Sequence, residues 1–217
     1  MVKIIQECKN PEILVVTPLL PGHKINGITK KTIKRNSAPF TWISSEGNNN
    51  IPLNALTGLK WYKERFGKLP PYYMMIDRDI EAGRGLLDRL HRRLDRTGLN
   101  VGFAYATFQF KGHVNADFPA RPYDINRLIQ SNYISSNSMF KTSVIEHVGL
   151  VTDDKYKRLL DWAFLIKCFS YGYVGVPEPT AWFIAHSTDK DISAGSQEEY
   201  MEKYQLVWQD FIRPLLN

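Results

Sequence analysis

The chain alternates short apolar stretches, typical of buried strands, with stretches in which apolar residues recur at the spacing of a helix. This alternation favours an α/β fold, in which helices flank a sheet. We therefore expect an α/β protein with a central, mostly parallel sheet flanked by helices. The predicted strands cover residues 12–20, 40–44, 72–76, 101–110, 173–176 and 181–184.

Helices are predicted between these strands from apolar stripes and end signals. Asn54 is a candidate N-cap for a helix that Gly67 ends, and Gly172 ends a longer helix. Ser196 and Glu199 form a candidate capping box for the last helix. The predicted helices cover residues 28–35, 54–66, 143–147 and 154–171, with one more marked by the stripe Leu86, Leu87, Leu90 and Leu94 and a last one after Ser196.

The composition fits one water-soluble domain. The chain has 217 residues, 43% of them hydrophobic, which is enough for one sizeable core, so we expect a single domain over residues 1–217. It contains no apolar run long enough to cross a bilayer, and its start lacks the apolar core and cleavage site of a signal peptide. Cys8 and Cys168 are too few for a disulfide framework and lack metal-ligand spacing. We expect a soluble, cytoplasmic protein.

Two carboxylates follow the apolar run 72–76, which ends at Asp77-Arg78-Asp79. Carboxylates two residues apart just beyond a strand can both turn toward one divalent cation. Mg²⁺ and Mn²⁺ prefer hard oxygen ligands, so two such carboxylates and the phosphate oxygens of a substrate make a workable site. The alternative is a solvated acidic turn, because motifs this short recur by chance.

Three further polar positions fall where predicted strands end, which is where ligands collect in parallel α/β sheets. They are Thr17-Pro18, Ser45-Glu46-Gly47 and His186. His186 is a candidate imidazole ligand for Mn²⁺, and the alternative is an ordinary surface histidine. Glu46 is a candidate acceptor for the base or ribose of a nucleotide, and the alternative is a plain polar turn.

Asp161 is a candidate general base. It lies inside the predicted helix 154–171 among apolar neighbours, and burial there would raise its pKa toward the working range of a base. A carboxylate within hydrogen-bond reach can accept the proton of an attacking hydroxyl group. The alternative is a structural ion pair with Arg158 or another neighbour.

Basic residues are concentrated in two segments, and the formal net charge is +6. Such segments attract polyanions, anionic membrane surfaces or nucleotide diphosphates, although a generic solubilising surface is an equal alternative. Arg84 is a candidate for contact with a phosphate group. The two segments contain Lys24, Lys30, Lys31, Lys34 and Arg35, and then Arg84, Arg89, Arg92, Arg93 and Arg96.

The order of these motifs resembles that of GT-A glycosyltransferases, specifically the family-2-like group of inverting enzymes, over about residues 12–195. No single motif is specific, but their order and spacing together are. The usual acidic pair on a helix is reduced to Asp161, with Leu160 before it. The matching segments are Val15-Val16-Thr17-Pro18, Ser45-Glu46-Gly47, Asp77 with Asp79, residues 135–141 through Val148-Gly149, Leu160-Asp161-Trp162, and His186-Ser187 with Ser193.

The resemblance implies a GT-A (Rossmann-like) fold and transfer of a sugar from a nucleotide-sugar, here a UDP-sugar, with inversion. Asp77 would favour the ribose side, and Asp79, with Asp77 nearby and His186 completing the site, would hold Mn²⁺ or Mg²⁺ against the departing diphosphate. Asp161 would be the general base. The residues assigned to the nucleotide-sugar are Thr17, Pro18, Glu46, Asp77 and Arg84.

The acceptor is the least determined part of the prediction. Small, soluble, basic glycosyltransferases of this kind resemble those with which bacterial viruses decorate hydroxymethylated pyrimidines in DNA. We therefore favour a DNA acceptor, bound through its phosphates with the target base flipped out of its stack; the location would then be the host cytoplasm. A cell-surface glycan or a lipid-linked saccharide is the second choice.

Two other classes of function are open alternatives. One is a non-catalytic, basic nucleic-acid-binding module. The other is a metal-dependent phosphoesterase or nuclease that uses Asp77 and Asp79, which is disfavoured because no further carboxylates occur nearby at two-metal spacing. The sugar, the nucleotide base and the oligomeric state are not indicated by the sequence.

Overall fold

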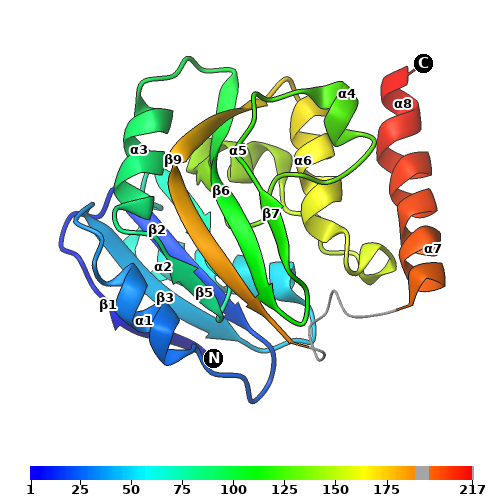
Figure 1. Ribbon diagram of the computed structural model, residues 1–217. Coiled ribbons are helices and arrows are strands. Elements are labelled where there is room, and N and C mark those ends of the chain that lie inside the picture. Colours follow the sequence, from blue (N-terminus) through cyan, green and yellow to red (C-terminus); the bar gives the residue numbers. More distant parts are fainter. Residues whose placement is uncertain (189–195, 217) are drawn as a thin grey trace.

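The protein is built around one curled sheet with helices on both faces (Figure 1). The computed structural model describes residues 1–188 and 196–216. The strands are β1 (Val2–Gln6), β2 (Ile13–Leu19), β3 (Phe40–Glu46), β4 (Tyr72–Met75), β5 (Ile80–Ala82), β6 (Val101–Gly112), β7 (Ala116–Phe118), β8 (Met139–Lys141) and β9 (Val174–Ser187). Their order in the sheet is β1-β3-β2-β4-β8-β6-β9-β5, and β7 pairs with β6 outside this path.

The sheet is mixed, which corrects the prediction of a mostly parallel sheet. The neighbours β3, β2 and β4 are parallel, as are β6 and β9. β8, however, is inserted antiparallel between β4 and β6. The edge strands β1 and β5 are also antiparallel to their neighbours. The three-residue strands β5 and β8 were not predicted, because their side-chain alternation is too short to stand out.

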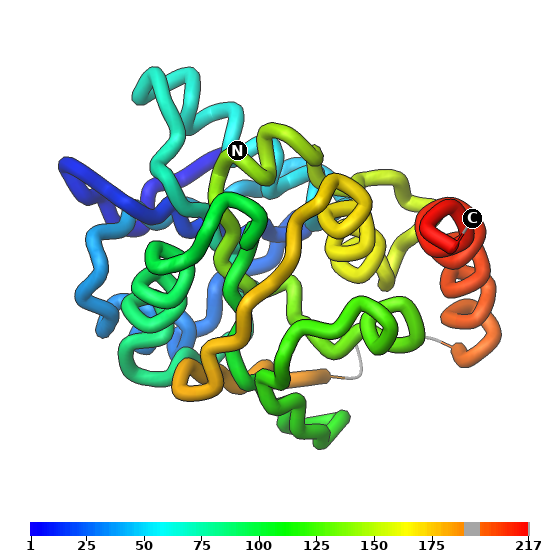
Figure 2. Tube along the Cα trace, turned by 90° about the horizontal axis from the view of Figure 1, so that it is seen from above, coloured from blue at the N-terminus to red at the C-terminus, as the bar shows by residue number. Residues whose placement is uncertain are grey.

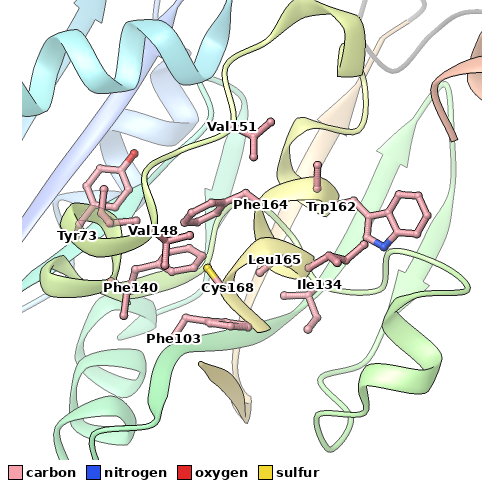
Figure 3. Packing of buried hydrophobic residues seen from close by; sticks show 14 of the residues in the cluster. Tyr73, Phe103, Ile134, Phe140, Val148, Val151, Trp162, Phe164, Leu165 and Cys168 are labelled. Atoms are coloured by element: carbon pink, nitrogen blue, oxygen red, sulfur yellow. The ribbon is translucent and has the colours of Figure 1, made fainter. Parts of the chain in front are cut away.

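Helices cover both faces of this sheet. On one face the apolar sides of α2, α5 and α6 share a core cluster with Leu14 and Val16 of β2, and on the other those of α1 and α3 share a second cluster with Ile13 and Val15. A strand buried on both faces reads as a continuous apolar run, as β2 does. Figure 3 shows part of the core on the face that α2, α5 and α6 cover. The helices are α1 (Gly27–Ile33), α2 (Ile51–Phe66), α3 (Leu86–Asp95), α4 (Ile125–Leu128), α5 (Thr142–Val148), α6 (Leu160–Ser170), α7 (Gln197–Val207) and α8 (Arg213–Leu216).

The last helices pack on the α6 side of the molecule (Figure 2). The ring of Tyr204 on α7 stacks on Trp162 of α6, with ring centroids 5.1 Å apart. Ser196 is confirmed as the N-cap of this segment, since the Glu199 N–H donates to Ser196 Oγ, while the reciprocal bond of a capping box stays a prediction. Within the described ranges, no helix is both long enough and apolar enough to cross a membrane.

The start of α2 differs from the prediction. Asn50, not Asn54, is the N-cap, and its Oδ1 accepts a hydrogen bond from the Leu53 N–H. Asn54 is fully buried and its amide donates to the carbonyls of Leu19 and Asn48. Asn54 therefore ties the end of β2 to the loop after β3. Gly67 ends the helix with a φ of 81°, as predicted.

The predicted helix 154–171 is divided in two. A 3₁₀ turn covers Asp154–Tyr156, and α6 begins only at Leu160. Arg158 between them has a φ of 78°, in the left-handed region that helices exclude. As a result Asp161 lies in the first turn of α6 rather than inside a helix, which places it at the surface of a cavity.

β9 is one continuous strand where two separate strands were predicted. It continues through Pro177, which pairs with Tyr105 of β6, and its parallel pairing with β6 shifts register beyond that point, between Ala106 and Thr107. Its far end pairs with β5, and the His186 N–H donates to the carbonyl of Asp79. The fold thus brings His186 beside the carboxylate segment that follows β4.

Candidate active site

A cavity of about 300 Å³ opens where β2 and β4 end. Parallel strands converge there, so side chains that follow different strands face the same space. The cavity brings together five of the predicted site residues, which are Pro18, Asp77, Asp79, Asp161 and His186. Phe110 and Ala185, from β6 and β9, contribute apolar wall.

Asp77 is held by Asn137, a buried residue of the segment that leads into β8. The amide of Asn137 donates to Asp77 Oδ2 over 2.7 Å, and Asn137 Oδ1 accepts from the Asp77 N–H over 2.8 Å. These two bonds orient the carboxylate and fix the backbone at the end of β4. The sequence indicated Asn137 only as part of the segment 135–141 and suggested no role for it. A role could not be predicted because its contact with Asp77 joins positions 60 residues apart.

Replacing Asn137 with alanine should destabilise the protein by about 1–3 kcal/mol, because the partly buried Asp77 N–H and an Asp77 carboxylate oxygen then lose their hydrogen bonds with Asn137. Urea unfolding of Asn137→Ala measures this loss. Asn115→Ala is the control, since Asn115 is exposed and its amide donates to the nearby Gly112 carbonyl. Equal unfolding midpoints for Asn137→Ala and the wild type would contradict the role given to Asn137.

The donor set around Asp79 suits a divalent cation that also binds phosphate. The carboxylates of Asp77 and Asp79 and the imidazole of His186 line the cavity, and His186 Nε2 lies 3.1 Å from Glu81 Oε2. Among the residues that the structure describes, no three His, Cys, Asp or Glu side chains form a ready-made metal cluster. Mg²⁺ and related ions are commonly held by one or two carboxylates with substrate phosphates supplying the rest, so the residues present fit such an ion.

Asp161 lies at the start of α6 on the wall of the cavity. Its Oδ2 accepts a hydrogen bond from the Asn132 amide over 3.1 Å. Burial raises the pKa of Asp161, while bonds from its own backbone N–H, the Trp162 N–H and Asn132 lower it. The side chain is therefore a shielded carboxylate on the cavity wall, with its pKa raised toward the range in which a base works.

Basic side chains also line the cavity, and sequence reasoning gave them no ligand role. His23 comes from the loop after β2, Arg78 from between the two aspartates, and Lys157 and Arg158 from the break before α6. Arg158 Nη1 also lies 3.6 Å from Glu199 Oε2 on α7. The positive charges of Arg78, Lys157 and Arg158 favour an anionic ligand. The break before α6, which places two of them, depends on a left-handed residue that no local pattern indicates.

Three predicted residues do not line the cavity. Thr17 is buried, and its Oγ1 accepts a hydrogen bond from Trp42 Nε1 over 3.0 Å. Glu46 Oε1 accepts from the Gly22 N–H over 2.8 Å and so supports the loop that carries His23. Arg84 is exposed just before α3. Their contacts with a nucleotide-sugar stay predictions, and Ser193 lies outside the described residues.

No protein-family model and no curated protein sequence matches the chain. Solved structures do match it. TarS of S. aureus has a TM-score of 0.62 at 12% identity, covering 92% of this chain and 39% of TarS. Its fragment 1–349 in complex with UDP-GlcNAc has a TM-score of 0.65 at 12% identity, covering 90% and 65% of the two chains. The chain thus spans less than two thirds of these neighbours.

A third match is the mannosyltransferase PcManGT of Pyrobaculum calidifontis in complex with GDP-Man and Mn²⁺. Its TM-score is 0.60 at 12% identity, with 98% of this chain and 68% of that protein covered. Together these likenesses identify the fold as the Rossmann-like GT-A fold of glycosyltransferases, as the order of motifs predicted.

Proposed function

We propose that this protein is a metal-dependent glycosyltransferase that moves a sugar from a nucleotide-sugar to an acceptor hydroxyl group with inversion. One observation carries the proposal: a single cavity joins the carboxylates Asp77 and Asp79 to the shielded carboxylate Asp161. The GT-A fold supports it, as do the UDP-GlcNAc and the GDP-Man with Mn²⁺ bound by structural neighbours.

The donor side of the reaction falls to the end of β4. Asp79, with Asp77 and His186 beside it, would hold Mn²⁺ or Mg²⁺, and the ion would supply positive charge against the departing diphosphate. Asp77 turns toward the ribose. Lys157 and Arg158 add fixed positive charge on the same cavity wall. Thr17, Pro18, Glu46 and Arg84 are proposed as further contacts or supports for the nucleotide-sugar.

The acceptor side falls to Asp161. The hydroxyl group of the acceptor attacks the anomeric carbon from the face opposite the diphosphate, and its proton passes to the Asp161 carboxylate. A single base with no second nucleophile gives inversion. The Asn132 amide, bonded to Oδ2, orients the carboxylate for this step.

The proposed acceptor is a hydroxymethylated base of DNA. The helices α1 and α3 are joined where Asn36 Oδ1 accepts from the Leu87 N–H and Ser37 Oγ donates to Asp88. Both helices carry exposed basic residues, and we propose that a DNA strand binds across them through its phosphates. A glycan or lipid-linked saccharide is the second candidate. The exposed basic residues of this surface are Lys30, Lys31, Lys34, Arg35, Arg84, Arg92, Arg93 and Arg96.

Duplex DNA should bind this surface in a salt-dependent manner. In the double variant with Lys31→Glu and Arg92→Glu, the slope of log Kd against log salt concentration should fall by about two, one for each lost phosphate contact. Fluorescence anisotropy with labelled duplex measures the slope. Lys60→Glu is the control. Lys60 is an exposed residue of α2, on the other face of the sheet, so its replacement should leave the slope unchanged. If no duplex binds at low salt, the acceptor is a glycan or lipid-linked saccharide.

The activity itself is tested by a screen of sugar nucleotides for transfer and hydrolysis in the presence of Mn²⁺. The acceptors are DNA that contains hydroxymethylated cytosine and a mixed glycan pool. Transfer to either supports a glycosyltransferase. Cleavage of DNA or of phosphate esters without any sugar nucleotide would favour a phosphoesterase or nuclease instead.

A further inference from the structure

A second cavity of about 50 Å³ adjoins the candidate active site. It is mostly apolar, and by the usual measure a single water needs roughly 10–15 Å³, so it has room for a group of a few non-hydrogen atoms. The two cavities share Pro52, Met75, Ser136, Leu160 and Asp161. The inner cavity alone is lined by Tyr73, Ser135, Phe140, Leu150, Val151, Phe164 and Leu165.

The hydroxyl group of Tyr73 is the unexplained feature of this inner cavity. Tyr73 is 2% exposed, and within residues 1–188 and 196–216 its hydroxyl group has no hydrogen-bond partner. Its ring lies among Phe140, Val148 and Phe164 (Figure 3). Folded proteins leave few such groups unpaired, because each costs free energy. Burial and the nearby charge of Asp77 raise the pKa of Tyr73, so the hydroxyl group keeps its proton and can donate.

We propose that the inner cavity receives the acetamido group of the sugar being transferred, an inference that rests on the proposed glycosyltransferase function. The methyl group of the acetamido substituent packs against Phe140 and Phe164. Its carbonyl oxygen accepts a hydrogen bond from Tyr73, and its N–H faces Ser136 and Asp161 on the wall that both cavities share. The donor is thus a nucleotide-linked N-acetylhexosamine.

The physical basis is the mismatch between a mostly apolar pocket and the buried hydroxyl group of Tyr73, which has no partner in the described part of the chain. A sugar that carries a hydroxyl group in place of the acetamido group leaves the cavity unfilled and the Tyr73 hydroxyl group without a partner. An acetamido group fills the cavity and supplies the missing acceptor. Sites with a buried polar group discriminate strongly against ligands that leave it unpaired.

The test compares the affinities of UDP-GlcNAc and UDP-Glc in the presence of Mn²⁺ by titration calorimetry. We expect the wild type to bind UDP-GlcNAc more tightly, and Tyr73→Phe to reduce this preference by about tenfold while leaving the affinity for UDP-Glc unchanged. Val151→Ile, which adds a methylene to the cavity wall, should weaken UDP-GlcNAc selectively. Without ligand, Tyr73→Phe should unfold at a higher temperature than the wild type.

Tyr123→Phe is the matched control. The Tyr123 hydroxyl group is also buried and has no partner in the described part of the chain, but Tyr123 lines neither cavity. It should raise the unfolding temperature without changing the donor preference. Equal affinities of the wild type for UDP-GlcNAc and UDP-Glc would overturn the acetamido assignment and leave the glycosyltransferase proposal standing. If neither UDP nor GDP binds in the presence of Mn²⁺, both proposals fall.

Discussion

Asp161→Asn is expected to lose transfer activity by about 10³-fold, because the amide cannot accept the proton of the acceptor hydroxyl group. The affinity for UDP with Mn²⁺ should stay close to that of the wild type, since Asp161 is proposed to act on the acceptor and lies on α6 rather than at the end of β4. Steady-state rates of transfer and calorimetric binding of UDP measure the two effects separately.

The stability of Asp161→Asn provides the control that the fold is intact. Burial makes the pKa of Asp161 higher in the folded protein than its usual 3.8. The folded state therefore holds this proton more tightly than the unfolded chain does, and stability is lost as pH rises from 3.8 through the raised pKa. The amide of Asp161→Asn does not ionise, so the variant does not lose stability as the pH rises. It should therefore unfold at a higher temperature than the wild type at pH 7. Wild-type turnover in a stable Asp161→Asn would refute the assignment of the base.

Asp79→Asn should lower transfer by about 10²–10³-fold, because the cation that neutralises the departing diphosphate loses a charged ligand. Unlike Asp161→Asn, this variant should also weaken the binding of UDP in the presence of Mn²⁺, and raising the Mn²⁺ concentration should restore part of the rate. Initial rates measured across a range of Mn²⁺ concentrations report both effects.

Glu64→Gln is the matched control for Asp79→Asn. Glu64 is an exposed carboxylate on α2 and does not line the cavity, so its loss should change neither the rate nor the Mn²⁺ dependence. If Asp79→Asn and Glu64→Gln have equal rates at every Mn²⁺ concentration, the assignment of Asp79 as a metal ligand is wrong.

The sequence predicted those parts of the fold whose pattern is local. The apolar run 13–19 became β2, buried on both faces, and the Leu stripe of residues 86–94 became α3 with its leucines in the core. The α/β fold and its GT-A type were confirmed. The direction of β8 was not predictable, because a three-residue strand carries no directional signal and takes its place from its neighbours β4 and β6.

The candidate site was predicted best where a motif directly follows a strand. Asp77 and Asp79 follow β4, and they meet Asp161 and His186 around one cavity. What the sequence did not reveal depends on contacts between distant segments. Asn137 meets Asp77 across 60 positions, and the left-handed conformation of Arg158 decides where α6 begins. Neither feature has a local signature that could have been recognised.

Thermal unfolding with and without UDP and Mn²⁺ tests most directly whether this cavity is a nucleotide-sugar site. A ligand that binds only the folded protein raises its unfolding temperature by mass action. We predict that UDP and Mn²⁺ together raise the midpoint of the wild type more than the sum of their separate effects, and that Asp79→Asn lacks this synergy. No shift of the wild type with Mn²⁺ and either UDP or GDP would contradict the account.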